Sequence, residues 1–118
     1  MEGGYRVPVT EADRIRVGLT VQLVAAATGI PAERIRQRAR LDGPAGRARR
    51  LAMYVAHVTL GWPLERVGHG FGLNRATAAA ACRWVEDGRD QPALDAMLDR
   101  LDRCAREILD APPCELPA

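Results

Sequence analysis

Apolar residues recur every three or four positions along most of the chain, which is the spacing of one face of an α-helix. The first such stretch begins at Thr10, where Asp13 three residues later completes a capping box, and it stops near Gly29. Its predicted buried stripe consists of Ile15, Leu19, Leu23 and Ala26 or Ala27. A short second helix is predicted from Ala32 to about Arg38, directly after Pro31.

Four more helices are predicted after the sequence "LDGPAG" (41–46), which is read as a loop. Their expected ranges are 47–60, 63–70, 75–87 and 92–110. Leu51, Val55 and Val58 form the stripe of the third helix, and Leu94, Met97, Leu98, Leu101, Cys104 and Ile108 that of the sixth. No strand pattern competes, so the prediction is an all-α bundle of five to six short helices. One domain would span 10–110, with a flexible arm at 1–9 and a disordered tail at 111–118.

The fifth predicted helix, "RATAAAACRWVED", carries unusually small side chains. Its core face consists of Ala78, Ala81, Cys82 and Val85, and its opposite face of Arg75, Ala76, Ala79, Ala80 and Arg83, with Thr77 between them. A short helix, the turn "GFGL" and a second helix capped by Asn74 are typical of a helix-turn-helix. Small side chains would let this helix lie deep in a DNA major groove, although a close-packed interface between helices is the alternative.

Positive charge is concentrated in one part of the sequence. Seven of the 17 basic residues, all arginines, lie between Arg34 and Arg50, and only Asp42 offsets them there. The last 29 residues are instead acidic on balance. A basic cluster on a small domain of net charge +2 suggests a polyanionic partner, although a solvated charged face is equally consistent with it.

The segment 47–86, "RARRLAMYVAHVTLGWPLERVGHGFGLNRATAAAACRWVE", resembles the C-terminal DNA-binding domain of the bacterial replication initiator DnaA, a helix-turn-helix of the Trp-repressor type. The similar parts are the basic start at Arg47, Arg49 and Arg50, then 51–55, 64–68, 70–72, 81–83 and 85–86. A weaker similarity extends from about Ile15 to about Glu107. The resemblance implies that Arg38 and Arg40 lie in a basic loop that enters the minor groove.

The sequence also departs from that family. The family's "GGRDHTT" is one residue shorter here, so its Asp, His and first Thr fall on Asn74, Arg75 and Ala76, and only the second Thr is retained, as Thr77. We therefore expect a different target sequence. No Gly-x-x-x-x-Gly-Lys-Ser/Thr loop is present, so no ATPase is expected. The chain is similar instead to stand-alone alphaproteobacterial regulators, such as the DnaA-like part of gene transfer agent transcription activators.

These features predict a sequence-specific, double-stranded DNA-binding transcription regulator. Phosphates or the minor groove would be contacted by Arg38, Arg40, Arg47, Arg49 and Arg50, with Arg83 also near phosphate, and base edges by Asn74, Arg75, Ala76 and Thr77. At a promoter it would act as an activator with a co-activator or RNA polymerase, or as a homodimer. The acidic face Asp95, Asp99, Asp102 and Glu107 would either aid solubility or bind such a partner. The alternative is a non-DNA-binding adaptor built on a degenerate DnaA-like fold.

Other classes of function are not expected. The three cysteines form no CxxC pair, so no metal site or other cofactor is predicted, and Cys82 and Cys104 are expected to be small core residues. His57 and His69 have no nucleophile at a recognised spacing, so no enzyme is predicted. No apolar run approaches the length of a membrane span, which favours a cytoplasmic, nucleoid-associated location. Trp84 is expected to pack against the sixth helix.

Overall fold

The computed structural model describes residues 8–118, and within this range it contains six helices and no strand. The helices are α1 (Glu11–Thr28), α2 (Ala32–Ile35), α3 (Gly43–Val58), α4 (Leu64–Gly70), α5 (Arg75–Gly88) and α6 (Pro92–Asp110). The predicted all-α bundle is therefore confirmed. The part of the predicted N-terminal arm before Pro8 lies outside the described residues, and after Asp110 the chain is non-helical and exposed.

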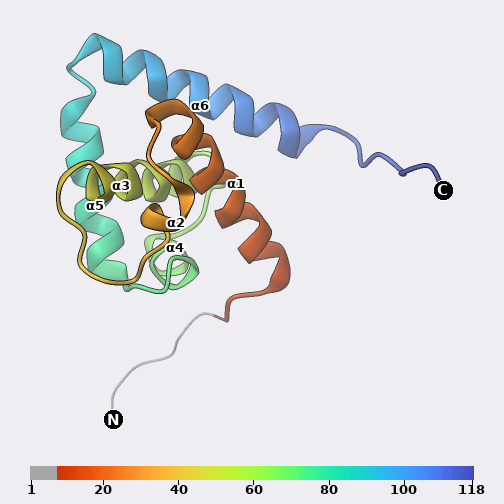
Figure 1. The fold of residues 1–118 in the computed structure, drawn as a ribbon, viewed down its shortest axis with the longest axis horizontal. Helices are drawn as coiled ribbons and strands as arrows, with labels where there is room; N and C mark the ends of the chain where they lie inside the picture. Colours follow the sequence, from red (N-terminus) through yellow and green to blue (C-terminus); the bar gives the residue numbers. More distant parts are fainter. Residues whose placement is uncertain (1–7) are drawn as a thin grey trace.

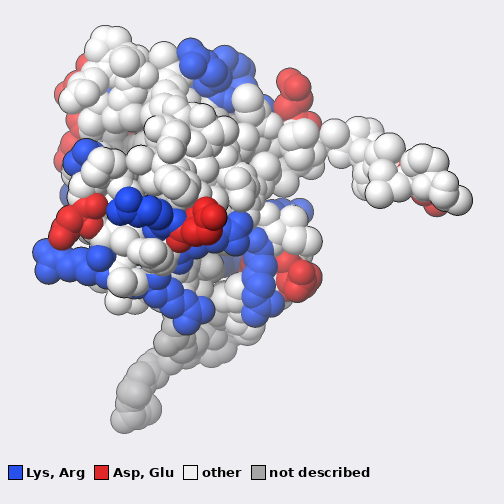
Figure 2. All heavy atoms as spheres, viewed as in Figure 1, with Lys and Arg blue, Asp and Glu red and all other residues white. Residues whose placement is uncertain are grey.

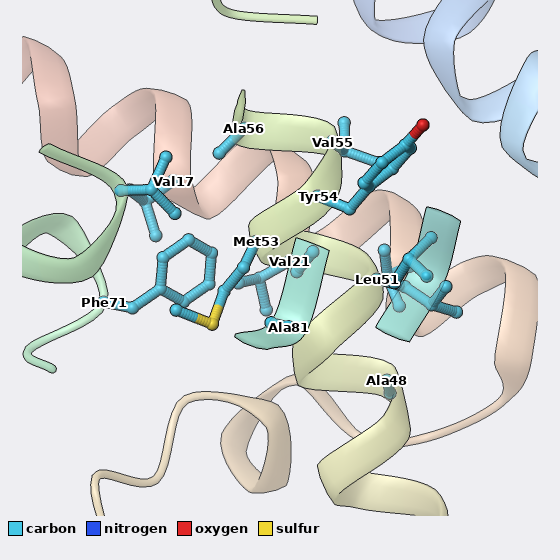
Figure 3. Packing of buried hydrophobic residues seen from close by; sticks show 14 of the residues in the cluster. Val17, Val21, Ala48, Leu51, Met53, Tyr54, Val55, Ala56, Phe71 and Ala81 are labelled. Carbon is cyan, nitrogen blue, oxygen red and sulfur yellow. The ribbon is translucent and has the colours of Figure 1, made fainter. Parts of the chain in front are cut away.

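Helix α3 lies at the centre of the bundle, with α1 packed on one side of it and α5 on another (Figure 1). Helix α4 packs against α5, and α6 runs across the end of the molecule over α1 and α3. Every residue from Leu51 to Ala56 is buried, and Figure 3 shows Met53, Phe71 and Val17 directed into one cluster. Alanines and valines make up much of this core, which lets the helices approach closely.

The buried face of α1 is rotated around the helix axis relative to the predicted one. Ile15 is 66% exposed, whereas the buried positions are Asp13, Val17, Thr20, Val21 and Val24. Two of these are polar, and each is satisfied internally. The Thr20 hydroxyl donates to the Val17 carbonyl at 2.9 Å, and the Asp13 carboxylate accepts from Arg66 of α4. Polar residues can be buried when they have such partners, so the spacing of apolar residues alone does not identify the buried face of α1.

The boundaries of α2 and α3 also differ from the prediction. Helix α2 ends at Ile35, three residues early, and α3 begins at Gly43 inside the segment expected to be a loop. Pro44 fits the first turn of α3 because an N–H there has no partner within the helix. Helix α3 ends at Val58 rather than Leu60. The residues between α2 and α3, 36–42, therefore form one loop, which we call the basic loop.

Cys104 and Ile108 were expected in the core but are exposed, Ile108 by 67%. The buried residues of α6 are Leu98, Leu101 and Ala105, and beyond them the helix runs away from the rest of the bundle (Figure 1). With no helix opposite it, the last part of the stripe has nothing to pack on. Cys82 is half-buried, and this burial raises the pKa of its thiol to about 11.

A polar network fastens α6 to α3 and α5. Arg89, after α5, donates to Asp95 at 2.6 Å and to Asp99 at 2.8 Å. It also donates to the Tyr54 hydroxyl at 3.2 Å, and that hydroxyl donates to Glu86 at 2.8 Å. Asp102 likewise accepts from Thr59 of the chain after α3. Three of the four residues in the predicted acidic face are thus engaged within the protein.

Candidate nucleic-acid interface

A short turn, 71–74, joins helix α4 to helix α5. The Leu73 amide donates to the Gly68 carbonyl at 2.7 Å, which closes the turn after α4. Gly68 itself touches the start of α5, since a Cβ built on it would lie 2.4 Å from the Asn74 carbonyl oxygen. Gly72 adopts the left-handed conformation that favours glycine, at φ 73°. Glycine at these two positions permits the short connection between the helices.

The N-terminal turn of α5 presents Asn74, Arg75 and Ala76 to solvent. The Asn74 side-chain oxygen accepts from the Thr77 amide at 2.9 Å and from the Thr77 hydroxyl at 3.0 Å, so it caps the helix. Reading adenine with both ends of the amide would require breaking this cap. Arg75 is exposed and is therefore the side chain of this turn best able to contact a guanine edge.

A groove of about 740 Å³ runs between the basic loop, the first half of α3 and the outer face of α5. Its lining includes five of the ten predicted DNA-binding residues, namely Arg40, Arg49, Arg50, Ala76 and Thr77. These residues come from three separate segments of the sequence. The small side chains of α5 form one wall, and guanidinium groups stand on the other sides. The predicted recognition helix therefore borders the groove. The lining is positively charged on balance, although it also includes Asp42, which lies 3.9 Å from Arg40.

Arg49 holds the basic loop against α3. Its Nη1 donates to the carbonyl of Gln37 at 2.6 Å and to the carbonyl of Ala39 at 3.1 Å. Burial and, secondarily, the charge of Arg50 lower the pKa of Arg49, but a guanidinium remains charged at neutral pH. Gly46 allows the same close approach, since a Cβ there would lie 2.4 Å from the Leu41 carbonyl oxygen. Arg49 thus positions the loop, a function that the sequence prediction missed.

Arg50 rests on Trp84. Its guanidinium carbon lies 4.9 Å from the centre of the indole ring, a cation–π contact that joins α3 to α5. Trp84 is 40% exposed, and on its other side it lines a smaller pocket together with Leu94 of α6. The expected packing of Trp84 against α6 stays a prediction, because the two share a pocket lining rather than a given contact, and the contact of Trp84 with Arg50 was not predicted.

The remaining predicted residues lie outside the groove. Arg38 lies across the turn at Gly72, and Arg47 lines the smaller pocket beside Trp84 and Leu94. Arg83 is exposed on α5. Figure 2 shows basic side chains gathered over the lower half of the face in view, with acidic side chains among them. The basic surface therefore extends beyond the groove.

The described residues, 8–118, offer no group of three or more His, Cys, Asp or Glu side chains that could hold a metal ion. Within the same residues, no helix is both long and apolar enough to cross a membrane. The Nδ1–H of His57 donates to the carbonyl of Trp62 at 2.7 Å, which ties the end of α3 to the chain before α4.

We compared the chain with protein-family models, curated proteins and solved structures, and none of them matches it.

Proposed function

We propose that this protein is a sequence-specific, double-stranded DNA-binding transcription regulator without ATPase activity. The observation that carries the proposal is the groove in which the small outer face of α5 stands opposite Arg40, Arg49 and Arg50. A helix with small side chains can enter a major groove deeply, and the basic groove beside it can follow a phosphate backbone. The DnaA-like helix-turn-helix sequence supports the same assignment.

In the proposed complex, α5 lies in the major groove with Arg75 on a guanine edge and Ala76 close to the bases. One DNA backbone passes along the groove, where Arg50 and Arg40 neutralise its phosphates. The basic loop then lies over the adjoining minor groove. Trp84 holds the Arg50 guanidinium in place, which reduces the entropy that Arg50 loses on binding.

Selection of binding duplexes from a random library by the purified protein tests this function directly. We expect a shared motif, and chromatin immunoprecipitation in the native cell should place that motif at promoters. Enrichment of no motif, together with equally weak binding to all duplexes, would instead favour the adaptor. Action at a promoter would involve a protein partner or a second copy of this chain, because one such domain buries limited surface on DNA.

Arg75→Ala tests the recognition helix. We expect it to cost about 1–3 kcal/mol of binding free energy on the selected duplex and to relax the preference at one or two positions of the motif. Arg103→Ala on α6 removes the same charge from an exposed position outside the groove and serves as the control. An unchanged motif in Arg75→Ala, measured by repeating the selection, would exclude the assigned base contact.

Arg49→Ala tests the basic loop. Because Arg49 ties down the carbonyls of Gln37 and Ala39, its loss should release the loop and weaken binding to all duplexes similarly. It should also make the chain more sensitive to trypsin after Arg38 and Arg40, which mass spectrometry of the fragments would detect. Arg50→Ala is the matched control, since it removes a neighbouring arginine that makes no such bond. Equal cleavage of both variants at these sites would show that Arg49 does not restrain the loop.

A further inference from the structure

A second basic pocket shares no lining residue with the groove. It has a volume of about 310 Å³ and is enclosed by α1, the basic loop and the turn between α4 and α5. Its basic lining residues are Arg14, Arg36, Arg38 and His69, and the rest of the lining is apolar or glycine. Among residues 8–118, no Asp or Glu lines it, and this lining suits an anion.

The arginines of the pocket are poorly neutralised by the described part of the protein. Arg14 lies 3.9 Å from Glu11, but both side chains are more than 60% exposed, and such surface pairs are weak. Within residues 8–118, neither Arg36 nor Arg38 lies within 4 Å of a carboxylate. Three arginines that line one pocket, of which only Arg14 has a carboxylate within 4 Å among residues 8–118, favour a bound oxyanion. Their planar donors match the geometry of phosphate.

The structure also fixes where the pocket stands relative to α5. Arg38 lies against the turn, because a Cβ on Gly72 would meet its Nε at 2.6 Å. Gly72 is only two residues before the cap Asn74. The pocket therefore opens beside the N-terminal end of α5, where a helix-turn-helix approaches bases while the preceding element crosses the DNA backbone.

We propose that this pocket is a phosphate subsite, in which Arg14 and Arg36 bind one phosphodiester of the DNA backbone next to the bases contacted by α5. This inference rests on the proposed DNA binding. It adds Arg14 of α1 and Arg36, the first residue of the basic loop, to an interface predicted from Arg38 and Arg40 of that loop and from α3 and α5. The contact would be sequence-independent and would fix the position of α5 along the duplex.

The double variant Arg14→Gln/Arg36→Gln tests the subsite. Fluorescence anisotropy would measure the affinity for the selected duplex over a range of salt concentrations. We expect the slope of log affinity against log salt to fall in magnitude by about 0.9, the contribution of one phosphate, with weaker binding at fixed salt and an unchanged motif. Arg100→Gln/Arg103→Gln on the exposed side of α6 removes the same charge and should keep the wild-type slope. Thermal unfolding confirms that each variant is folded.

The outcomes separate this inference from the proposed function. A wild-type protein that binds no duplex overturns both. A wild-type protein that selects a motif, with a slope that Arg14→Gln/Arg36→Gln leaves unchanged, overturns the subsite alone. Phosphorus NMR with inorganic phosphate distinguishes the source of the anion. Phosphate binding that the double variant loses, with an unchanged DNA slope, would assign the pocket to free phosphate and overturn its DNA role.

Discussion

Replacing Gly68 by alanine is expected to lower the free energy of unfolding by about 3 kcal/mol and to abolish DNA binding. A Cβ at this position would lie 2.4 Å from both the carbonyl carbon and oxygen of Asn74, and 2.9 Å from the amide nitrogen of Arg75. These are backbone atoms at the start of α5, so they can move away only if the whole helix shifts. Such a shift would disrupt the packing of Ala78 and displace Arg75.

Denaturant unfolding of Gly68→Ala, followed by circular dichroism, measures this effect. Gly18→Ala is the matched control, because Gly18 also lies within a helix. The atom nearest to its Cβ would be the Nη2 of Arg36 at 3.2 Å, the tip of a flexible side chain. Alanine has the higher helix propensity, so this control should be as stable as the wild type or up to about 1 kcal/mol more stable. Equal stability of both variants would contradict the close approach of α4 and α5.

Most of the helical framework follows from short-range signals in the sequence. Three local signals mark helix ends, and all three do so in the structure. They are the capping box of Thr10 and Asp13, the left-handed φ of Gly29 and the side-chain cap of Asn74. The interval 41–46 misled the prediction because glycine and proline are typical of loops. Here Pro44 instead occupies the first turn of α3, and Gly46 allows contact with the Leu41 carbonyl. That contact joins residues whose close approach no local pattern reveals.

The predicted interface was recovered only in part, for a similar reason. Helical spacing identified the small outer face of α5, and that face does border the groove. The partner of Arg49 is a pair of backbone carbonyls ten and twelve residues earlier, so its positioning role depends on how the loop folds back. Arg14 and Arg36 are 22 residues apart in the sequence, and they line one pocket only because the folded chain brings α1 and the loop together there. Such contacts depend on tertiary structure and leave no periodic signal.

The second large effect is expected at Asp13, which anchors α1 to α4. Its side chain is 4% exposed and accepts from the Arg66 Nη2 at 2.5 Å, while the Arg66 guanidinium stacks 4.6 Å from the centre of the Trp62 ring. Asp13→Ala would leave this arginine without its carboxylate and remove half of the capping box with Thr10. Removing one partner of a buried ion pair costs about 3–5 kcal/mol, and because Arg66 is 40% exposed we expect about 3 kcal/mol.

The same pair predicts how stability depends on pH. The hydrogen bond from Arg66, more than any other interaction, lowers the pKa of Asp13 below its ordinary value near 3.8. The folded state therefore binds this proton less readily than the unfolded chain does. The stabilisation is complete above about pH 4 and is lost as pH falls through the lower, folded-state pKa.

Urea unfolding at a series of pH values should thus show a wild-type advantage over Asp13→Asn that shrinks below about pH 4. Asp110→Asn, at the exposed end of α6, should stay within about 0.5 kcal/mol of the wild type at neutral pH. A difference between wild type and Asp13→Asn that is constant down to pH 2 would mean that the ionised carboxylate contributes nothing, and that the loss comes from packing alone.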